Sequence, residues 1–238
     1  MAALEVRNLT KKYRPGQGNE VQALDGISMS INDSEFVSVV GRAGSGKTTL
    51  LRCMGLLIRP TSGQVIIDRV DTASLSDGER ADFRGRRVGF VLRDHSLLPT
   101  LSVLQNVVLP VRYGPFRRGA KKRARELLDL VGLADLMRRR PDELSNGQAQ
   151  RVAIARAMIK EPGVVLADEP TGEVENETSD ELLYLLRQLN RTSGVTLVIA
   201  THDLEVASCT DRMIRIRDGQ VAADERLRVD LRRLRELR

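Results

Sequence analysis

The sequence has no tryptophan, and aromatic residues make up only 3% of its 238 positions. Its basic runs, such as RRGAKKRARE from residue 117, therefore lack the interleaved aromatic side chains on which nucleic-acid bases stack. No segment approaches the roughly 20 uninterrupted apolar residues that a membrane span needs, and the opening MAALEVRNLTKKY lacks the apolar core of a secretion signal. We therefore expect a cytosolic protein.

Cysteine is also scarce, which argues against a disulfide framework. Cys53 and Cys209 stand without CxxC or histidine spacing, so we expect two reduced, packed thiols and no zinc site. No internal repeat or low-complexity linker divides the chain. The formal charge of +6 suits a phosphate-rich ligand, nucleic acid or an anionic membrane surface, and does not decide among them.

The pattern of apolar residues predicts an α/β fold. The first forty residues alternate as antiparallel strands do and end in an apolar run at 36–40, and a helical segment at 49–57 precedes a strand pair near 64–68. From about residue 161 strands and helices alternate, which favours a parallel sheet, and a charged, helix-like segment ends the chain. We expect one domain, 1–238, with about 1–92 and 161–238 forming the core and β subdomain and about 93–160 an inserted helical subdomain.

The most specific motif is a glycine-rich loop that fits GxxxxGK[ST] between the strand at 36–40 and the helical segment after it. Glycines let successive backbone N–H groups face a phosphate, and the N-terminus of the next helix adds roughly half a positive charge. A chance glycine-rich turn is the alternative, and a second motif downstream argues against it. The residues expected to bind nucleotide are Gly41, Gly44, Ser45, Gly46, Lys47, Thr48 and Thr49.

Separate roles are expected for the residues of these two motifs. Lys47 should neutralise the β- and γ-phosphates, and the Thr48 hydroxyl should ligate Mg²⁺, which prefers oxygen ligands. The second motif, VVLADE, is a buried strand that ends in Asp168 and Glu169 at a sheet edge where ligands bind. We expect Asp168 to hold the metal through water and Glu169 to orient or deprotonate the attacking water. A solvated strand end is the alternative for two such acids standing alone.

A third motif, LSNGQ at 144–148, is followed by the helical run AQRVAIARAMI. Ser145 is suited to cap that helix, whose N-terminus could form a second anion site, although an ordinary capped helix has the same pattern. The segment closely resembles the LSGGQ signature of ABC-type ATPases, and the resemblance covers essentially the whole chain. The stretches LLPTLSVLQNV, ADEPTG and VTLVIATHD look like the lipoprotein-release, macrolide-export and cell-division branch.

The resemblance implies a phosphate-loop (RecA-like) ATPase that works as a head-to-tail homodimer. Each of two MgATP would lie between one phosphate loop and Ser145, Gly147 and Gln148 of the other copy. It implies transmembrane permease-type subunits on a separate chain, which would keep this chain at the cytoplasmic face of the membrane, and neither nucleic acid nor another metal is expected. It also implies that Tyr13 stacks on adenine and that His202 contacts the γ-phosphate, although from the residues alone a core tyrosine and a structural histidine fit as well.

Three positions depart from the family pattern. Arg93 stands where the family has a glutamine that offers an oxygen to Mg²⁺, and a guanidinium has no acceptor. A guanidinium about 4 Å from Mg²⁺ would be repelled by roughly 8 kcal/mol at an effective dielectric of about 20, so we expect Arg93 to avoid the metal. We expect water to fill the vacant ligand position and hydrolysis or coupling to be weakened. Glu175 replaces an aspartate that touches the other subunit, and Asn146 replaces a signature glycine, which should matter little.

Two other functions remain open at this point. Arg93 and Glu175 together suit a degenerate subunit that binds ATP and scarcely hydrolyses it, against which the intact Lys47, Asp168, Glu169 and His202 argue. A nucleic-acid ATPase of the same superfamily is opposed by the absence of a long coiled-coil insertion and of a second ATPase domain. The apolar stretch LLPTLSVLQNVVLP at 97–110 fits either a socket for a partner's helix or packing within the helical subdomain.

Overall fold

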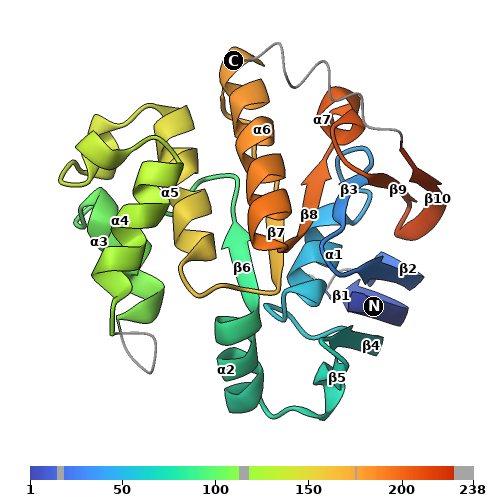
Figure 1. Ribbon diagram of the computed structural model, residues 1–238. Helices are drawn as coiled ribbons and strands as arrows, with labels where there is room; N and C mark the ends of the chain where they lie inside the picture. Colours follow the sequence, from blue (N-terminus) through green and yellow to red (C-terminus); the bar gives the residue numbers. More distant parts are fainter. Residues whose placement is uncertain (15–18, 113–117, 175, 228–238) are drawn as a thin grey trace.

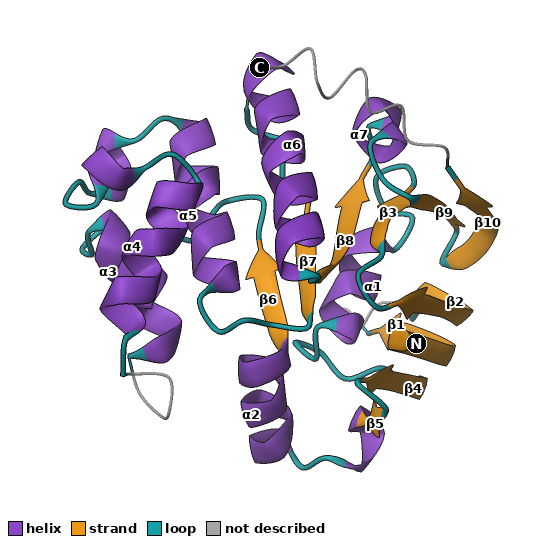
Figure 2. Cartoon of the chain, in the orientation of Figure 1, coloured by secondary structure: helices purple, strands orange, loops and turns teal. Residues whose placement is uncertain are grey.

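The computed structural model describes residues 1–14, 19–112, 118–174 and 176–227, and its strands form two sheets (Figures 1 and 2). In chain order the strands are β1 (Ala2–Tyr13), β2 (Val21–Asn32), β3 (Phe36–Val40), β4 (Ser62–Ile67), β5 (Val70–Asp71), β6 (Val88–Val91), β7 (Val164–Asp168), β8 (Thr196–Thr201), β9 (Arg212–Arg217) and β10 (Gln220–Arg226). The larger sheet has the order β10-β9-β3-β8-β7-β6 and the smaller one β2-β1-β4-β5.

The α-helices connect these strands and pack on both faces of the larger sheet. They are α1 (Lys47–Met54), α2 (Asp77–Arg87), α3 (Val103–Val108), α4 (Ala120–Leu130), α5 (Asn146–Met158), α6 (Asn176–Ser193) and α7 (Leu204–Ser208). None of the helices in the described part of the chain combines the length and apolarity that crossing a bilayer requires.

Parallel pairing in the larger sheet follows from strands that are apolar on both faces. β3 pairs in parallel with β8 and β9, and β7 with β6 and β8, as the alternation of strands and helices predicts. Along β7, Val164 and Leu166 face one hydrophobic core while Val165 and Ala167 face the other. Side chains alternate between the two faces of a strand, so this uninterrupted apolar run is what a doubly covered sheet needs.

Two hydrophobic cores contain buried residues from both sheets and from the helices. One lies between the sheets and contains the apolar face of α1, including Leu50 and Met54. The other lies on the opposite face of the larger sheet, where residues of α3, α4, α5 and α6 pack together. Figure 1 shows α3 and α4 on the far side of α5 from the sheet, and α5 packs directly on β6. The helical stretch expected at about 93–160 therefore shares a continuous core with the sheet, and its limits as a subdomain stay a prediction.

Several local expectations differ from the structure. The helix expected to reach residue 57 ends at Met54, because the chain turns at Gly55 and Leu56 takes a φ of 58°. The apolar pattern of the sequence did not predict α2, in which seven of eleven residues are charged and whose start is held by a capping box between Ser76 and Glu79. The charged, helix-like segment was expected at 226–238. Its first residue, Arg226, is the last residue of β10, and the segment from residue 228 onward lies outside the described residues.

Candidate nucleotide-binding and hydrolysis site

Three predicted motifs meet at one edge of the larger sheet because they follow parallel strands that end in register. Val40 at the end of β3 pairs with Thr201 of β8, and Asp168 at the end of β7 pairs with Ala200. The phosphate loop at 41–49, the two acids after β7 and His202 after β8 therefore emerge together. Ligands of open α/β sheets bind at this carboxyl edge.

The phosphate loop has a backbone that glycine alone accommodates at its last turn. Gly46 has a φ of 105° and caps α1 with no side-chain hydrogen bond, and a Cβ there would lie 2.5 Å from the carbonyl oxygen of Ala23. Lys47 folds over the loop, where its Nζ donates to the carbonyls of Gly41 at 2.8 Å and Arg42 at 3.2 Å. The loop is thus a closed turn with an ammonium group on its surface.

The shape of the loop suits an anionic ligand, and so does a buried hydroxyl group that lacks a hydrogen-bond partner. Ser45 is 7% exposed, and its buried hydroxyl has no hydrogen-bond partner in the structure. A Cβ on Gly41 would lie 2.5 Å from that hydroxyl oxygen. Buried polar groups without partners are costly, so a ligand oxygen is a suitable partner here. Thr49, also expected in this site, lies half-buried in the first turn of α1.

Thr48 and Asp168 form the second part of the site. The Thr48 hydroxyl donates to Asp168 Oδ1 at 3.2 Å, which joins the start of α1 to the end of β7. Burial raises the pKa of the Asp168 carboxyl above its usual value, Thr48 opposes this by its hydrogen bond, and the neighbouring Glu169 adds to it. A partly buried carboxylate beside a hydroxyl is a donor set that suits a hard divalent cation.

Glu169 is held in a strained backbone conformation by the strand beside it. Its φ is 47°, which costs a residue with a side chain about 1–2 kcal/mol. Its N–H donates to the carbonyl of Ala200 at 2.8 Å, and its carboxylate accepts from Thr201 Oγ1 at 3.3 Å. The other carboxylate oxygen lies 2.9 Å from His202 Nδ1. Sequence reasoning missed Thr201, whose only signal was its place directly before His202.

The signature segment forms a capped helix at some remove from this edge. Ser145 Oγ accepts from the backbone N–H of Gln148, whose side chain accepts from the N–H of Ser145 in return. Gly147 packs against α6, where a Cβ would lie 2.4 Å from Thr178 Cγ2. Within the described ranges no hydrogen bond or ion pair joins Ser145, Gly147 or Gln148 to the phosphate loop, so a single chain does not bring the two predicted halves of the site together.

Tyr13 lies at the end of β1 on the same side of the molecule as the phosphate loop. It pairs with Val21 of β2, and Ala23 two residues further along β2 contacts Gly46. The ring is 38% exposed, and Lys11 Nζ lies 5.2 Å from its centroid. An accessible ring near the loop is compatible with stacking on a base and excludes a fully buried core role for Tyr13.

Arg93, at the position where the family has a glutamine, forms an ion pair with Glu173 in the turn after β7. Arg93 Nε lies 3.6 Å from a carboxylate oxygen of Glu173, and both side chains are about half exposed. Asn146 of the signature donates its side-chain N–H to the backbone carbonyl of Glu173 at 2.9 Å. Glu175, the third departure from the pattern, lies outside the described residues.

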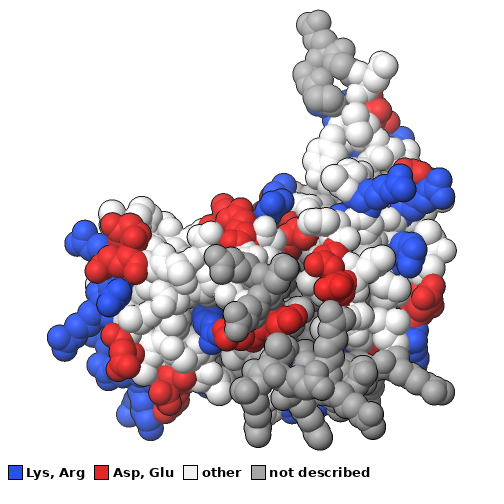
Figure 3. Space-filling model, turned by 90° about the horizontal axis from the view of Figure 1, so that it is seen from above, with Lys and Arg blue, Asp and Glu red and all other residues white. Residues whose placement is uncertain are grey.

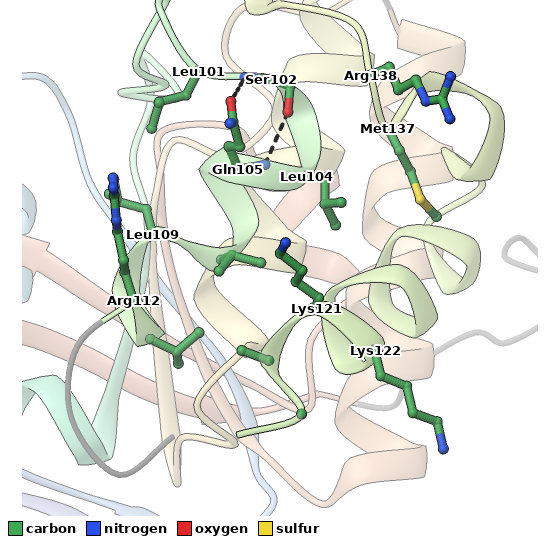
Figure 4. Close-up of a pocket in the computed structure, with 14 residues that line it drawn as sticks. Leu101, Ser102, Leu104, Gln105, Leu109, Arg112, Lys121, Lys122, Met137 and Arg138 are labelled. Atoms are coloured by element: carbon green, nitrogen blue, oxygen red, sulfur yellow. Dashed lines mark hydrogen bonds between the residues drawn. The ribbon is translucent and has the colours of Figure 1, made fainter. Parts of the chain in front are cut away.

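A separate groove of about 620 Å³ lies among the helices, between α3, the start of α4 and the segment around Met137 (Figure 4). The apolar residues of the stretch at 97–110 lie in two environments, the hydrophobic core and the groove. Val103 and Val107 are fully buried in the core, whereas Leu101, Leu104 and Leu109 line the groove. The remaining lining includes four cationic side chains, labelled in the close-up: Arg112, Lys121, Lys122 and Arg138.

Comparison with known proteins identifies the family. The family profile described as ABC transporter matches residues 24–172. The lipoprotein-releasing system ATP-binding protein LolD of Geobacter metallireducens is 46% identical over 222 residues, which cover 93% of this chain and 98% of that protein. The macrolide export ATP-binding/permease protein MacB of Syntrophobacter fumaroxidans is 42% identical over 224 residues, and the chain spans only 31% of its length.

A solved structure supports the same assignment. The ATP-binding cassette MJ0796, in a dimeric post-hydrolysis state with ADP and Pi, has a TM-score of 0.86 and 39% identity, covering 94% of this chain and 99% of that one. The protein of that name is from Methanocaldococcus jannaschii. This chain belongs to the ABC transporter family as one of its ATP-binding, ATP-hydrolysing subunits. The predicted fold, a phosphate-loop ATPase core with antiparallel β and helical parts, is confirmed, as is the resemblance to lipoprotein-release and macrolide-export relatives.

Proposed function

We propose that the chain binds MgATP at the carboxyl edge of the larger sheet and hydrolyses it with Glu169 as the residue that activates water. The observation that carries this proposal is the meeting of the phosphate loop, Asp168, Glu169 and His202 at that edge, fixed by the in-register strands β3, β8 and β7. Lys47 and the loop N–H groups bind the β- and γ-phosphates, with Gly41, Gly44, Ser45, Gly46 and Thr49 shaping the cradle.

Thr48 and Asp168 are the residues that would hold Mg²⁺, since they already lie within hydrogen-bond distance of each other. The ion supplies charge neutralisation between phosphate oxygens when it is bound. Partial burial of Asp168 keeps water from screening the site, which strengthens its attraction for a cation.

Glu169 and His202 act on the attacking water and the terminal phosphate. Thr201 and His202 fix both oxygens of the Glu169 carboxylate, and the backbone bond to Ala200 fixes its Cα. A base held in one orientation pays little ordering cost when it accepts a proton. His202 is exposed and its Nδ1 lies 2.9 Å from Glu169, and its proposed role is to contact the γ-phosphate.

We propose a homodimer in which the signature of one copy completes the site of the other. Ser145, Gly147 and Gln148 form a capped helix N-terminus that carries a partial positive charge, and no hydrogen bond or ion pair of the described residues joins it to the phosphate loop of its own chain. The dimeric form of MJ0796 with ADP and Pi supports this arrangement. Tyr13 stacks on the adenine ring in the same composite site.

The work of this ATPase is proposed to act on a membrane partner carried on a separate chain, which places the protein at the cytoplasmic face of the membrane. MacB is named as both ATP-binding protein and permease, and this chain spans 31% of its length. The groove at Leu101, Leu104 and Leu109, with its cationic rim, fits an amphipathic helix of that partner with acidic flanks. On the face in Figure 3, the basic and acidic side chains of the described residues are interspersed.

The proposal is tested by steady-state MgATP hydrolysis of the purified chain and of Glu169→Gln at several protein concentrations. We expect turnover per subunit to rise with concentration, because two copies complete the site, and to fall about 10²-fold or more in the variant. Glu126→Gln is the matched control, since it removes an exposed carboxylate that pairs with Lys122 on α4. ATP binding without turnover in the wild-type chain would favour the degenerate subunit, and turnover retained by Glu169→Gln would rule out the proposed base.

A further inference from the structure

The first residue of the signature helix is bonded to the turn that carries the proposed base. Asn146, at the start of α5, donates its side-chain N–H to the backbone carbonyl of Glu173 at 2.9 Å. The turn begins at Glu169, whose own carbonyl accepts from the N–H of Gly172 at 3.0 Å. A glycine, which the family pattern has at position 146, has no side chain to make the bond to Glu173. The substitution that was expected to matter little thus supplies a contact between the two segments.

The start of α5 is also packed closely against α6, the helix that follows this turn in the chain (Figure 1). A Cβ on Gly147 would lie 2.4 Å from Thr178 Cγ2, so the backbone of α5 approaches α6 there. One turn further along α5, Arg151 Nη2 lies 2.5 Å from a carboxylate oxygen of Glu181. These contacts leave the signature segment little freedom to shift independently of the turn and α6. A displacement of the signature is therefore passed to the far end of the turn.

Glu169, at the near end of the turn, depends on where the turn lies. Its φ of 47° is a conformation that a residue with a side chain keeps only where the surrounding structure imposes it. The carbonyl of Ala200 holds its N–H on one side, and the bond from Gly172 holds its carbonyl on the other. A turn fixed at its far end restricts the conformations open to Glu169. The carboxylate that Thr201 and His202 contact is carried by this backbone.

Asn146 has no part in the cap of its own helix, so its bond to the turn is separable from the stability of α5. The cap consists of Ser145 and Gln148, each of whose side chains accepts from the backbone N–H of the other residue. Alanine is a better helix former than asparagine. Asn146→Ala therefore removes the bond to the turn and leaves the cap and the helix in place.

We propose that Asn146 is a positioning residue that fixes the turn at 169–173 of its own chain and, through the turn, the Glu169 carboxylate. The inference rests on the proposed homodimer, in which the signature of one copy faces the nucleotide held by the phosphate loop of the other. Asn146 lies beside one site through its place in the signature and acts on the second site through the turn. Nucleotide bound against the signature of one copy thereby helps to place the base in that copy's own site.

The test measures MgATP hydrolysis in mixtures in which one site of each dimer is active. A small amount of chain with intact Glu169 is mixed, before ATP is added, with a large excess of the Glu169→Gln chain, so that almost every intact copy pairs with a mutated one. In the first mixture Asn146→Ala is in the intact copy, where it reaches the active base through the turn. In the second it is in the Glu169→Gln copy, whose signature faces the active site.

We expect turnover per intact copy to fall about two- to tenfold in the first mixture, the effect of one neutral hydrogen bond, and to match the mixture without Asn146→Ala in the second. Gln188→Ala is the matched control, since it removes an exposed amide that donates to Tyr184 Oη at 2.8 Å within α6. It should leave turnover unchanged in both arrangements. A merely structural role of Asn146 would not distinguish the two mixtures.

A second measurement does not depend on the dimer. Hydrogen exchange of the Gly172 amide in the nucleotide-free chain should be about two- to tenfold faster in Asn146→Ala, because the turn opens more often when its far end is released. Unchanged exchange would overturn the inference, and it decides the matter if wild-type chain hydrolyses ATP but its mixture with Glu169→Gln does not.

The remaining outcomes are distinct. A loss of turnover confined to the second mixture means that Asn146 acts on the nucleotide of the other copy, and an equal loss in both mixtures means a general disturbance of the signature. Either result overturns the inference, as does turnover unchanged in both mixtures. Absence of turnover in the wild-type chain at every concentration instead removes the proposed function on which the inference rests.

Discussion

Replacing Gly147 by alanine tests whether the signature helix owes its position to one close contact with α6. Gly147 is the second residue of α5 after the cap at Ser145, and a Cβ on it would lie 2.4 Å from Thr178 Cγ2. Carbon atoms in contact prefer about 3.5–4.0 Å, so the two helices must separate by about 1 Å or rearrange locally. The perturbation is one methyl group placed between two helices.

The expected magnitude combines two effects of opposite sign. Overpacking costs about 1–3 kcal/mol, whereas alanine is favoured over glycine within a helix by up to about 1 kcal/mol. We therefore expect Gly147→Ala to lower the free energy of unfolding by up to about 2 kcal/mol. Thr178→Ser removes Cγ2, and the nearest remaining Thr178 atom is Cβ at 3.7 Å, an ordinary contact. In that background Gly147→Ala should be neutral or stabilising.

The assay is equilibrium urea unfolding of the four proteins of this double-mutant cycle, with ATP turnover measured on each. The coupling energy between the two positions should be about 1–3 kcal/mol, because each substitution acts through the same contact. Turnover should fall in Gly147→Ala as the cap at Ser145 shifts, and in the double variant it should recover only in part, because Gly147 is also proposed to contact the nucleotide of the other copy. Equal destabilisation by Gly147→Ala in both backgrounds, or stabilisation of the wild-type chain, would refute the reasoning.

Two further predictions concern the phosphate loop and a buried thiol. Gly46→Ala should abolish measurable MgATP binding, because the φ of 105° and the Ala23 carbonyl oxygen at 2.5 Å exclude a Cβ at this position. Gly44 has a φ of 79° and open space around it, so Gly44→Ala should only weaken binding. Similar losses of binding in the two variants would contradict this. Burial raises the pKa of the Cys53 thiol from 9.0 to about 11, so at pH 8 iodoacetamide should label native Cys53 far more slowly than the partly exposed Cys209, and rapid native labelling of Cys53 would contradict its burial. The unfolded thiol ionises first as pH rises from 9 to 11, so the free energy of unfolding should fall across that window by on the order of 2 kcal/mol, and Cys53→Ala should flatten the loss measured by urea unfolding.

The sequence predicted the features that are encoded within single segments. The phosphate loop, the acids after β7 and the cap at Ser145 each depend on a strand, a turn or a helix start of a few residues, and a local pattern is enough to identify those. The parallel sheet was predictable for the same reason, since apolar runs such as 164–167 can only be buried on both faces. The highly charged α2 escaped the pattern because it has no apolar stripe, although its capping box was readable in the sequence at Ser76 and Glu79.

What the sequence by itself determined is therefore the family, the fold class and the residues expected to bind nucleotide. Tertiary structure alone decided which of them meet: register between β3, β7 and β8 brings the loop, Glu169 and His202 to one edge, while Ser145 remains apart. It also decided where Arg93 goes. The sequence shows that a guanidinium cannot bind a metal, but its partner, Glu173, lies in a distant segment, and only the packing of the turn after β7 beside the loop after β6 brings the two charges together.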